Sequence, residues 1–245
     1  MNNDQTIALV TGASKGIGHE IAAQLASLGM MVLLGARDRT RGEQAAASLR
    51  AAGGDVRCVV LDVTDAVTIR TAAEEIAEQF QRLDVLVNNA GISSSPALST
   101  ADLDVVRAVF ETNVFGVIAV TNAMLPLLRR SSAGRIVNLS SSVGSLARIS
   151  DPNGPYGAVR PSASYGPSKT ALNALTVQYA KELQGCGILV NAADPGGTAT
   201  DMTRSLGYQM KRSAAQAAAV VVRLATLGTG GPTGGFFDEA GRVEW

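Results

Sequence analysis

Short apolar runs alternate with longer stretches of helical periodicity along the whole chain, and this alternation constrains the fold more than any other feature. The runs are rich in β-branched residues and nearly all apolar, as expected for parallel strands that are covered on both faces. They are Thr6–Val10, Met31–Leu34, Val56–Leu61, Val85–Val87, Arg135–Leu139, Ile188–Ala192 and, more weakly, Gly235–Phe237. We therefore expect about seven strands in one sheet.

The stretches between the runs have the pattern of amphipathic helices. After the first run, Ile17, Ile21, Leu25 and Leu28 recur every three or four residues, and Gly29 is placed to end that helix. This repeated alternation predicts an α/β fold of the Rossmann type, a doubly wound parallel sheet with right-handed crossovers and helices on both faces. Because no linker or internal repeat divides the chain, residues 1–245 are expected to form a single domain.

Composition excludes several classes of protein. A hydrophobic content of 46% excludes a disordered chain, and 21 basic against 21 acidic residues give no electrostatic case for nucleic acid or an anionic membrane. One histidine (His19) and two cysteines (Cys58, Cys186) are too few for a self-contained metal site or a disulfide scaffold. No signal-peptide pattern and no apolar run near the roughly 18 residues of a membrane span are found, so a cytoplasmic protein is expected.

A glycine-rich turn follows the first run and leads into the first helix. Gly12 permits a sharp turn, Gly16 a close approach to a ligand, and Gly18 tight packing of helix and strand. The helix N-terminus offers free N–H groups to a pyrophosphate. The spacing is G-x3-G-x-G rather than G-x-G-x-x-G, and a purely structural turn is the alternative, but the strand–helix context favours a dinucleotide. The residues expected to contact it are Gly12, Ser14, Lys15, Gly16, Ile17 and Gly18.

The end of the second run indicates which dinucleotide is bound. At this point a carboxylate bonds the 2′-hydroxyl of NAD, whereas arginine accepts the 2′-phosphate of NADP. Arg37 follows the run, Arg41 lies one helical turn later, and Lys15 is expected to converge on the same place. Asp38 complicates this pattern, but we interpret it as the cap of the next helix. NADP(H) is therefore favoured over NAD(H).

Four further segments carry polar residues that a buried sheet or an apolar helix does not need. They are Asn88-Asn89-Ala90-Gly91, Asn113, Ser140-Ser141-Ser142 and Tyr165-Gly166-Pro167-Ser168-Lys169. In open α/β sheets, ligands bind beyond the carboxyl ends of the strands, and most of these residues fall there. Taken singly, each has an ordinary structural explanation as a surface pair, a turn former or a helix cap.

Together with the glycine-rich turn, these segments resemble the compact short-chain dehydrogenase/reductases over essentially the whole chain. The motifs are T-G-x3-G-x-G at Thr11–Gly18, N-N-A-G at Asn88–Gly91, Y-x3-K at Tyr165–Lys169 and P-G-x3-T at Pro195–Thr200. The resemblance implies a catalytic tetrad of Asn113, Ser141, Tyr165 and Lys169. It also implies that the cofactor is contacted by Asp62, Val63, Asn89, Ala90, Gly91, Tyr165, Lys169, Pro195, Gly196, Thr198 and Thr200.

The chemistry can also be argued from the side chains. Carbonyl reduction needs a hydride and a proton, and the pKa of tyrosine, about 10, must fall by about three units for proton transfer near neutral pH. That fall corresponds to roughly 4 kcal/mol, about what one positive charge at ~4 Å supplies at an effective dielectric constant of about 20. Lys169, four residues after Tyr165, is placed to supply it. Ser141 is expected to donate a hydrogen bond to the carbonyl oxygen, with Ser140 and Ser142 as alternatives. The resemblance also implies that Asn113 holds a water.

Two departures from the compact family concern the substrate site. The interval from Ser141 to Tyr165 is longer than usual and contains the proline- and glycine-rich segment Asp151–Pro161, so a substrate-loop insertion is expected near 146–161. Its intermediate length resembles the carbonyl-reductase branch and leaves the oligomeric state open between a monomer and a homo-oligomer, dimer or tetramer. Asp194 and Thr198 are polar changes beside the expected nicotinamide site.

The sequence therefore predicts a single NAD(P)-binding domain that acts as an NADPH-dependent carbonyl reductase or alcohol dehydrogenase on a small-molecule ketone, aldehyde or alcohol. Substrate contacts are expected from Ile92–Ser95, Ser142–Ile149, Asp151–Pro161 and Thr198–Met210, the last as a closing lid. The alternative is a dinucleotide-binding sensor on the same fold, although a sensor has no need to keep a proton relay.

Overall fold

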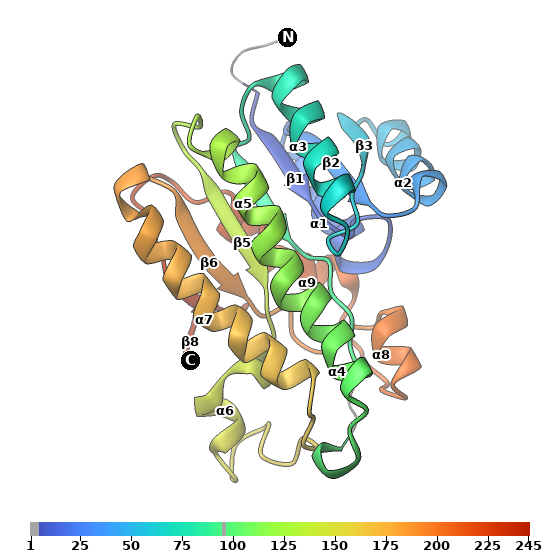
Figure 1. Ribbon diagram of the computed structural model, residues 1–245, viewed down its shortest axis with the longest axis vertical. Helices are drawn as coiled ribbons and strands as arrows, with labels where there is room; N and C mark the ends of the chain where they lie inside the picture. The colour runs from blue at the N-terminus through green and yellow to red at the C-terminus, as the bar shows by residue number, and fades with distance from the viewer. Residues whose placement is uncertain (1–4, 95–96) are drawn as a thin grey trace.

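Eight strands form one sheet in the computed structural model, which describes residues 5–94 and 97–245. Their order is β3-β2-β1-β4-β5-β6-β7-β8, and all pair in parallel except β8, which is antiparallel to β7 (Figure 1). The order reverses between β1 and β4, which creates the switch point where ligands bind in doubly wound folds. The strands are β1 (Ile7–Val10), β2 (Met31–Ala36), β3 (Val56–Val60), β4 (Val85–Asn88), β5 (Arg135–Leu139), β6 (Leu189–Ala193), β7 (Phe236–Phe237) and β8 (Arg242–Val243).

The predicted Rossmann-type sheet is confirmed, with one strand more than the seven expected. β1 to β7 lie where the apolar runs placed them, with small differences at their ends. β8 contains only Arg242 and Val243 and pairs with β7. A strand this short carries no apolar run, so hydrophobic periodicity could not reveal it.

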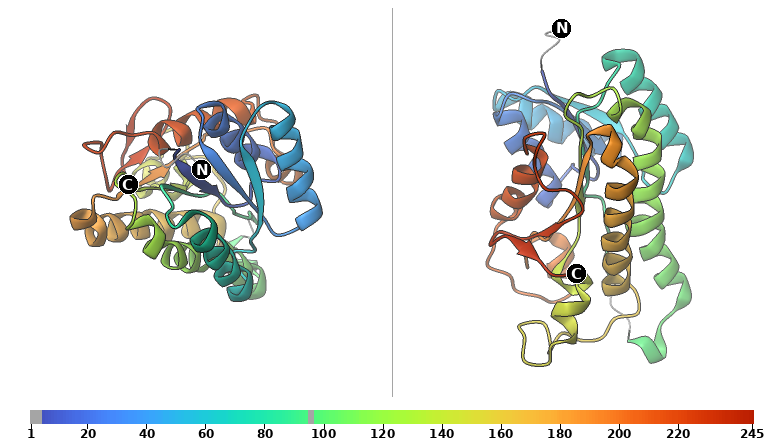
Figure 2. Two further views of the ribbon diagram at one scale, coloured as in Figure 1. Left: turned by 90° about the horizontal axis from the view of Figure 1, so that it is seen from above. Right: turned by 90° about the vertical axis from the view of Figure 1, so that its left-hand side faces the viewer.

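Helices cover both faces of the sheet, as Figure 2 shows. On one face, α1, α2 and α9 pack around buried Ile21, Leu49 and Val221. On the other, α3, α5 and α7 pack around buried residues such as Ile76 and Met124. The α-helices are α1 (Gly16–Ser27), α2 (Arg39–Ala51), α3 (Ala66–Phe80), α4 (Leu103–Phe110), α5 (Gly116–Leu128), α6 (Leu146–Ser150), α7 (Tyr165–Leu183), α8 (Asp201–Ser205) and α9 (Ala214–Ala225). Shorter helical segments are η1 (Leu98–Thr100), η2 (Glu111–Phe115), η3 (Ser142–Gly144) and η4 (Gln184–Cys186).

Two predicted helix ends are confirmed. The side chain of Asp38 accepts a hydrogen bond from the Arg41 N–H at 2.9 Å and so caps α2. Gly29, which follows α1, has φ of +82°, and its N–H donates to the carbonyl oxygen of Ala26 at 2.9 Å. The carboxylate of Asp38, which complicated the cofactor prediction, is therefore engaged in capping its helix.

Buried polar side chains connect the centre of the sheet to α5 and α7. Nδ2 of Asn88 donates to Oδ1 of Asn138 at 2.9 Å and to Oγ1 of Thr121 at 3.1 Å. Nδ2 of Asn138 in turn donates to Oγ1 of Thr176 on α7 at 2.9 Å. Because buried polar groups need partners, these bonds fix how α7 sits on β4 and β5, at whose ends the site lies.

The segment between β5 and α7 forms η3, α6 and a series of turns at the lower end of Figure 1. The irregular loop expected for Asp151–Pro161 is therefore observed. Its role at the substrate site stays a prediction. Within the described part of the chain, no helix has the length and apolar character needed to cross a membrane.

Candidate active site

The glycine-rich turn between β1 and α1 packs closely at two glycines and is open at the third. A Cβ at Gly12 would lie 2.9 Å from a backbone atom of the segment after β4, and one at Gly18 would lie 2.4 Å from Nδ2 of Asn89. A Cβ at exposed Gly16 would have its nearest neighbour, Cγ2 of Thr200, at 3.9 Å. Gly12 and Gly16 also have φ of +64° and +60°, which L side chains disfavour. The turn therefore leaves the Gly16 backbone open to a ligand.

Asn89 holds this turn against the end of β4. Its Nδ2 donates to the carbonyl oxygens of Thr11 at 2.8 Å and Gly12 at 3.1 Å. Oγ1 of Thr11 accepts from the N–H groups of Asn89 and Ala90, both at 3.0 Å. The Asn89 side chain, expected along the cofactor, is thus engaged in shaping the turn. Sequence reasoning missed this role of Thr11, for which the available signal was its place at the head of the glycine motif.

The N-terminus of α1 fits an anionic group such as a pyrophosphate. Among the described residues, no side chain caps the helix at Lys15, and the first turn contains no acidic residue. The first N–H groups of the helix therefore retain hydrogen-bonding capacity, and the helix dipole adds partial positive charge. Ser14 and Ile17 are half-buried on either side of exposed Lys15 and Gly16. Their contacts with a dinucleotide stay predictions.

The three cations expected at the adenosine end do not share one partner. Nζ of Lys15 donates to Oδ2 of Asp201 on α8 at 2.7 Å. Arg37 and Arg41 are exposed at the turn from β2 to α2, where Nε of Arg41 lies 4.0 Å from Oδ2 of Asp38. The ammonium group of Lys15 is thus paired with Asp201, and its convergence with the two arginines on a phosphate stays a prediction.

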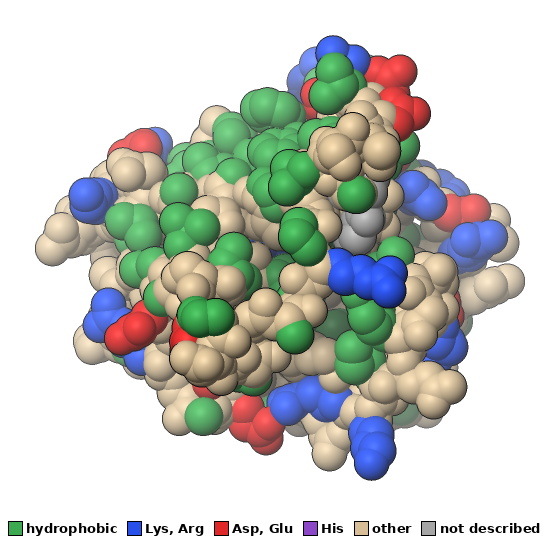
Figure 3. All heavy atoms as spheres, turned by 90° about the horizontal axis from the view of Figure 1, so that it is seen from below, with side chains coloured by type: hydrophobic (Ala, Val, Ile, Leu, Met, Phe, Trp, Pro, Cys, Tyr) green, Lys and Arg blue, Asp and Glu red, His purple; other side chains and the backbone are tan. Residues whose placement is uncertain are grey.

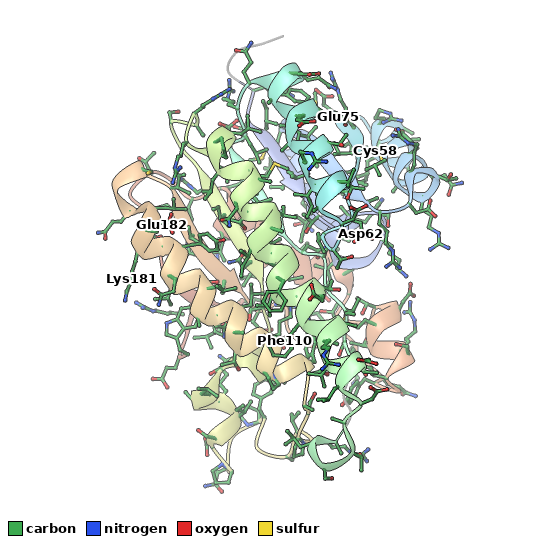
Figure 4. The ribbon with its side chains drawn as sticks, viewed as in Figure 1. Cys58, Asp62, Glu75, Phe110, Lys181 and Glu182 are labelled. Carbon is green, nitrogen blue, oxygen red and sulfur yellow. The ribbon has the colours of Figure 1, made fainter. Side chains whose placement is uncertain are left out.

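Asp62 and Val63 follow β3 at the same edge of the sheet. Figure 4 shows Asp62 beyond the end of β3 and Cys58 within the strand. Oδ1 of Asp62 accepts from the N–H of Thr64 at 2.9 Å and from its hydroxyl at 2.7 Å. Val63 is buried, and a Cβ at Gly116 would lie 2.8 Å from its carbonyl oxygen. The expected contact of these residues with an adenine stays a prediction.

Tyr165 begins α7 and meets Ser141, which follows β5. The Ser141 hydroxyl is close enough to the Tyr165 phenol to lower its pKa, and Nζ of Lys169 lies 5.6 Å from the centre of the Tyr165 ring. Lys181, the other lysine of α7, lies near the opposite end of the helix (Figure 4). The structure therefore brings three of the four predicted tetrad residues into one cluster.

Lys169 is buried and points toward β5. Its Nζ donates to the carbonyl oxygen of Leu139 at 2.6 Å. Burial lowers the pKa of Lys169 to about 8, because removal from water disfavours the ammonium form. A Cβ at Gly91 would lie 3.7 Å from Nζ and 3.2 Å from Oδ1 of Asn113, so glycine at this position spares both groups. Lys169 can therefore exchange a proton at mildly alkaline pH.

The pKa of Tyr165 is shifted in the direction opposite to that predicted. Burial and, to a smaller extent, the negative charge of Asp194 raise it to about 12, against the lowering effect of the Ser141 hydrogen bond. The sequence argument counted the attraction of Lys169 for the phenolate and gave too little weight to desolvation. Among the protein groups described, the net effect holds Tyr165 as a protonated phenol, the form that can donate a proton.

Asn113 lies in η2, a π-helical segment between α4 and α5, and its amide is fully engaged. Oδ1 accepts from the Ile92 N–H at 2.9 Å, and Nδ2 donates to the Ile92 carbonyl oxygen at 2.9 Å. Nδ2 also donates to Oγ of Ser168, next to Lys169, at 3.0 Å. π-helical turns are frequent at functional sites. Asn113 thus ties the segment after β4 to α7, whereas a water-holding role stays a prediction.

The three serines after β5 have different partners. Oγ of Ser140 donates to Oδ1 of Asn173 at 2.6 Å inside the fold. The Ser142 hydroxyl donates to the carboxylate of Asp194. Ser141 is the serine that contacts Tyr165, as the count from the strand predicted.

The turn after β6, expected at the nicotinamide end, leads from Pro195 into α8. Gly196 has φ of +71°, and its N–H donates to Oδ1 of Asp194 at 2.9 Å. Buried Thr198 donates from Oγ1 to the Gly196 carbonyl oxygen at 2.9 Å, and Thr200 is the N-cap of α8. The turn is therefore well ordered by its own hydrogen bonds, and cofactor contacts from it stay predictions.

These features define a Rossmann-type α/β protein with a Ser–Tyr–Lys cluster next to a cradle for a dinucleotide. Residues 6–211 match the family model described as short chain dehydrogenase. A short-chain dehydrogenase of Penicillium roqueforti, anuI, is 37% identical over 228 residues, which are 91% of this chain and 89% of that protein. A 3-oxoacyl-[acyl-carrier-protein] reductase of Synechocystis is 36% identical over 204 residues, 83% of this chain and 78% of that protein.

Solved structures agree with this match. The NADPH-bound carbonyl reductase from chicken fatty liver superposes with a TM-score of 0.85 at 27% identity, covering 98% of this chain and 99% of that one. The chain belongs to the short-chain dehydrogenase family. It is accordingly an oxidoreductase that acts on CH–OH or carbonyl groups with a nicotinamide cofactor.

Proposed function

We propose that the protein is an NADPH-dependent carbonyl reductase that interconverts a ketone or aldehyde and the corresponding secondary or primary alcohol. The observation that carries this proposal is the approach of Ser141 and Lys169 to half-buried Tyr165: the Ser141 hydroxyl acts on the pKa of the phenol, and Nζ of Lys169 lies 5.6 Å from the centre of its ring. The similarity to the NADPH-bound carbonyl reductase of chicken supports it.

The proposed cofactor site runs from the glycine-rich turn to the turn after β6. The open backbone at Gly16 and the uncapped N-terminus of α1 suit the pyrophosphate, and the segment Pro195–Thr200 suits the nicotinamide end. When bound, the reduced nicotinamide supplies a hydride to the carbonyl carbon and is left oxidised.

The proposed preference for NADP(H) depends on the residues after β2. Arg37 and Arg41 are exposed there and are placed to accept a 2′-phosphate, with Ala36 in place of an acidic residue. Asp38 does not oppose a phosphate strongly, because its carboxylate caps α2 and lies 4.0 Å from Nε of Arg41. The preference is therefore assigned to the two arginines.

In the proposed reaction, Ser141 donates a hydrogen bond to the carbonyl oxygen as negative charge develops on it. Tyr165 transfers its phenolic proton to that oxygen, which completes the alcohol. The pKa of Tyr165, raised to about 12 chiefly by burial, keeps the phenol protonated at neutral pH and so favours reduction. Lys169, whose pKa burial lowers to about 8, returns a proton to the phenolate through a bridging hydroxyl or water.

The proposed substrate is apolar around its carbonyl group. Exposed apolar side chains gather on the face seen in Figure 3, which is the end of the molecule where α4, α6 and α8 lie in Figure 1. Several belong to the segments predicted to contact substrate, although Ser95 of the segment Ile92–Ser95 lies outside the described residues. These side chains are Leu98, Leu103, Leu146, Ile149, Val159, Leu206 and Tyr208.

The test is turnover of a panel of ketones and aldehydes with NADPH, followed by the loss of nicotinamide absorbance. Tyr165→Phe is expected to lower kcat by a factor on the order of 10³ while NADPH binding, measured by fluorescence, persists. Tyr179→Phe is the matched control, because Tyr179 lies toward the other end of α7 and its hydroxyl donates to Oδ1 of Asn122 on α5 at 2.9 Å. Turnover is expected to persist in this variant. Wild-type protein that binds NADPH but reduces no carbonyl would support the sensor instead.

A further inference from the structure

A buried carboxylate outside the Ser–Tyr–Lys cluster accepts a hydrogen bond from Ser142, the neighbour of Ser141 in the chain. Asp194, which follows β6, is 4% exposed. Its N–H donates to the Phe237 carbonyl oxygen at 2.7 Å, and its Oδ1 accepts from the Gly196 N–H at 2.9 Å. Its Oδ2 accepts from the hydroxyl of Ser142. The backbone and the side chain of Asp194 are therefore both fixed, and its negative charge raises the pKa of the Tyr165 phenol.

Arg148 is the cation that faces this carboxylate. Its guanidinium Nη1 lies 3.7 Å from Oδ2 of Asp194 and donates to Oγ of Ser142 at 2.5 Å. Its Nη2 donates to Oδ2 of Asp238, after β7, at 2.7 Å. One side chain thus joins the ends of β5, β6 and β7. The forked, planar guanidinium group of arginine can reach several partners in this way.

Arg148 is carried by α6, which has little else to hold it. This helix has five residues, none of them buried, and Leu146 is 59% exposed. Its remaining contacts include hydrogen bonds to the C-terminal residues, from Oγ of Ser145 to the Glu244 carbonyl oxygen and from the Ala147 N–H to that of Trp245. Apolar burial does not anchor α6, so Arg148 and these two hydrogen bonds hold it against the sheet.

The charged groups of this network come from three elements. Among the described residues these are Lys169 from α7, Asp194 from the end of β6 and, facing Asp194, Arg148 from α6. Ser141 adds a hydrogen bond without charge. The negative charge that raises the pKa of Tyr165 is thus paired with a cation from the inserted segment.

We propose that Asp194 and Arg148 are positioning residues for the reaction at Tyr165. Their ion pair holds α6 against the end of β6, and Arg148 offsets the negative charge that Asp194 exerts on the phenol. The proposal rests on the proposed function of Tyr165 as proton donor and acceptor. One pair of side chains then determines both where the inserted segment, residues 146–161, lies and how acidic the phenol is.

The pH profile of alcohol oxidation with NADP⁺ separates this role from a merely structural one. Asp194→Asn removes the negative charge and is expected to move the rising limb of kcat/KM to lower pH by about one unit, a tenfold change in proton dissociation. Arg148→Met leaves the carboxylate uncompensated and is expected to move the limb to higher pH. The double variant follows Asp194→Asn, because the charge that Arg148 compensates is then absent.

Two further variants keep the test valid if the first ones fold poorly. Arg148→Lys retains the positive charge and is expected to keep the wild-type pH profile even if its stability falls. Asp238→Asn removes the other carboxylate partner of Arg148 but leaves the charge beside Tyr165, so no shift to lower pH is expected. Shifts of Asp194→Asn and Arg148→Met in the same direction, or no shift in either, overturn the proposal.

A readout without substrate separates this proposal from the proposed function. In Asp194→Asn, tyrosinate absorption is expected to appear at lower pH than in the wild type, and the difference is expected to vanish when Tyr165→Phe is added. Hydrogen exchange of residues 146–150 is expected to rise in Arg148→Met. If both hold while no carbonyl is reduced, the proposed function fails and the ion pair stands. If neither holds, the proposal on the ion pair fails.

Discussion

Lys169 lies 5.6 Å from the centre of the Tyr165 ring, and its ammonium group donates to the carbonyl oxygen of Leu139 at 2.6 Å. Lys169 is buried and Tyr165 is half-buried, and desolvation lowers the pKa of Lys169 to about 8 and raises that of Tyr165 to about 12. Burial therefore favours a neutral amine and a neutral phenol instead of an ion pair. The pair can exchange one proton without holding two opposite charges in a low-dielectric site.

Lys169→Met is expected to remove a pH-dependent part of the free energy of unfolding. The Lys169 pKa is about 8 in the folded chain and 10.5 as reference, so between these values the unfolded chain binds more protons and stability rises with pH. The stability gained from the neutral Lys169 amine is fully present above pH 10.5 and is lost as the pH falls through 8. Over that window the wild type should gain about 3 kcal/mol relative to the variant, measured by urea unfolding at several pH values.

Lys181→Met is the matched control for that experiment, because Lys181 is an exposed lysine on the same helix. Its difference from the wild type is expected to stay flat between pH 8 and 10.5. The raised pKa of Tyr165 acts with the opposite sign and at higher pH, above about 10, where the unfolded chain loses its proton first. A flat difference for Lys169→Met as well would contradict the buried, weakly basic amine.

Strands β1 to β7 were predictable because strands covered on both faces leave apolar runs in the sequence. β8 was not, since it depends on contacts such as the stacking of Trp245 on Phe236, with ring centres 5.6 Å apart. Ser141 and Lys169 were found as neighbours of Tyr165 because motif order and helical spacing carry that information. The sign of the Tyr165 pKa shift was not found, because burial depends on the whole fold.

Side-chain partners from distant parts of the chain were also beyond reach. Nothing in the sequence indicated that the ammonium group of Lys15 pairs with Asp201 of α8, at 2.7 Å. Asp194 was noted as an unusual polar residue, yet nothing in the sequence indicated that Arg148 faces it. Such pairs depend on how loops return to the sheet edge, which local pattern does not encode.

Replacing Arg37 and Arg41 together by alanine is expected to weaken NADPH binding by a factor on the order of 10², since a charged hydrogen bond contributes about 1.5–3 kcal/mol. NADH lacks the 2′-phosphate, so its dissociation constant is expected to change little. Fluorescence titration with both cofactors measures this difference. Arg129→Ala, an exposed arginine just after α5, serves as the control. Equal weakening of both cofactors would refute a phosphate-binding role for the two arginines.

Gly18→Ala is expected to abolish cofactor binding and to lower stability. The new Cβ would lie 2.4 Å from Nδ2 of Asn89 and 2.7 Å from the Gly12 carbonyl oxygen, so Asn89 must release the turn that it holds. Gly185→Ala is the control, because a Cβ there meets no described atom within 4 Å. Dissociation constants for NADPH and melting temperatures of the two variants compare them. Normal binding by Gly18→Ala would show that the turn does not need this close packing.

Ser141→Ala and Ser140→Ala separate chemistry from folding at adjacent positions. Ser141 acts on the Tyr165 phenol and is proposed to donate to the substrate carbonyl, so its loss is expected to lower kcat by a factor on the order of 10² with the melting temperature nearly unchanged. Ser140 donates to buried Asn173 at 2.6 Å, and its loss leaves that amide oxygen without its partner, at a cost of about 1–3 kcal/mol in stability. Kinetics and thermal unfolding of both variants therefore give opposite patterns. If Ser140→Ala instead lost turnover at unchanged stability, the assignment of Ser141 as the hydrogen-bond donor to substrate would be wrong.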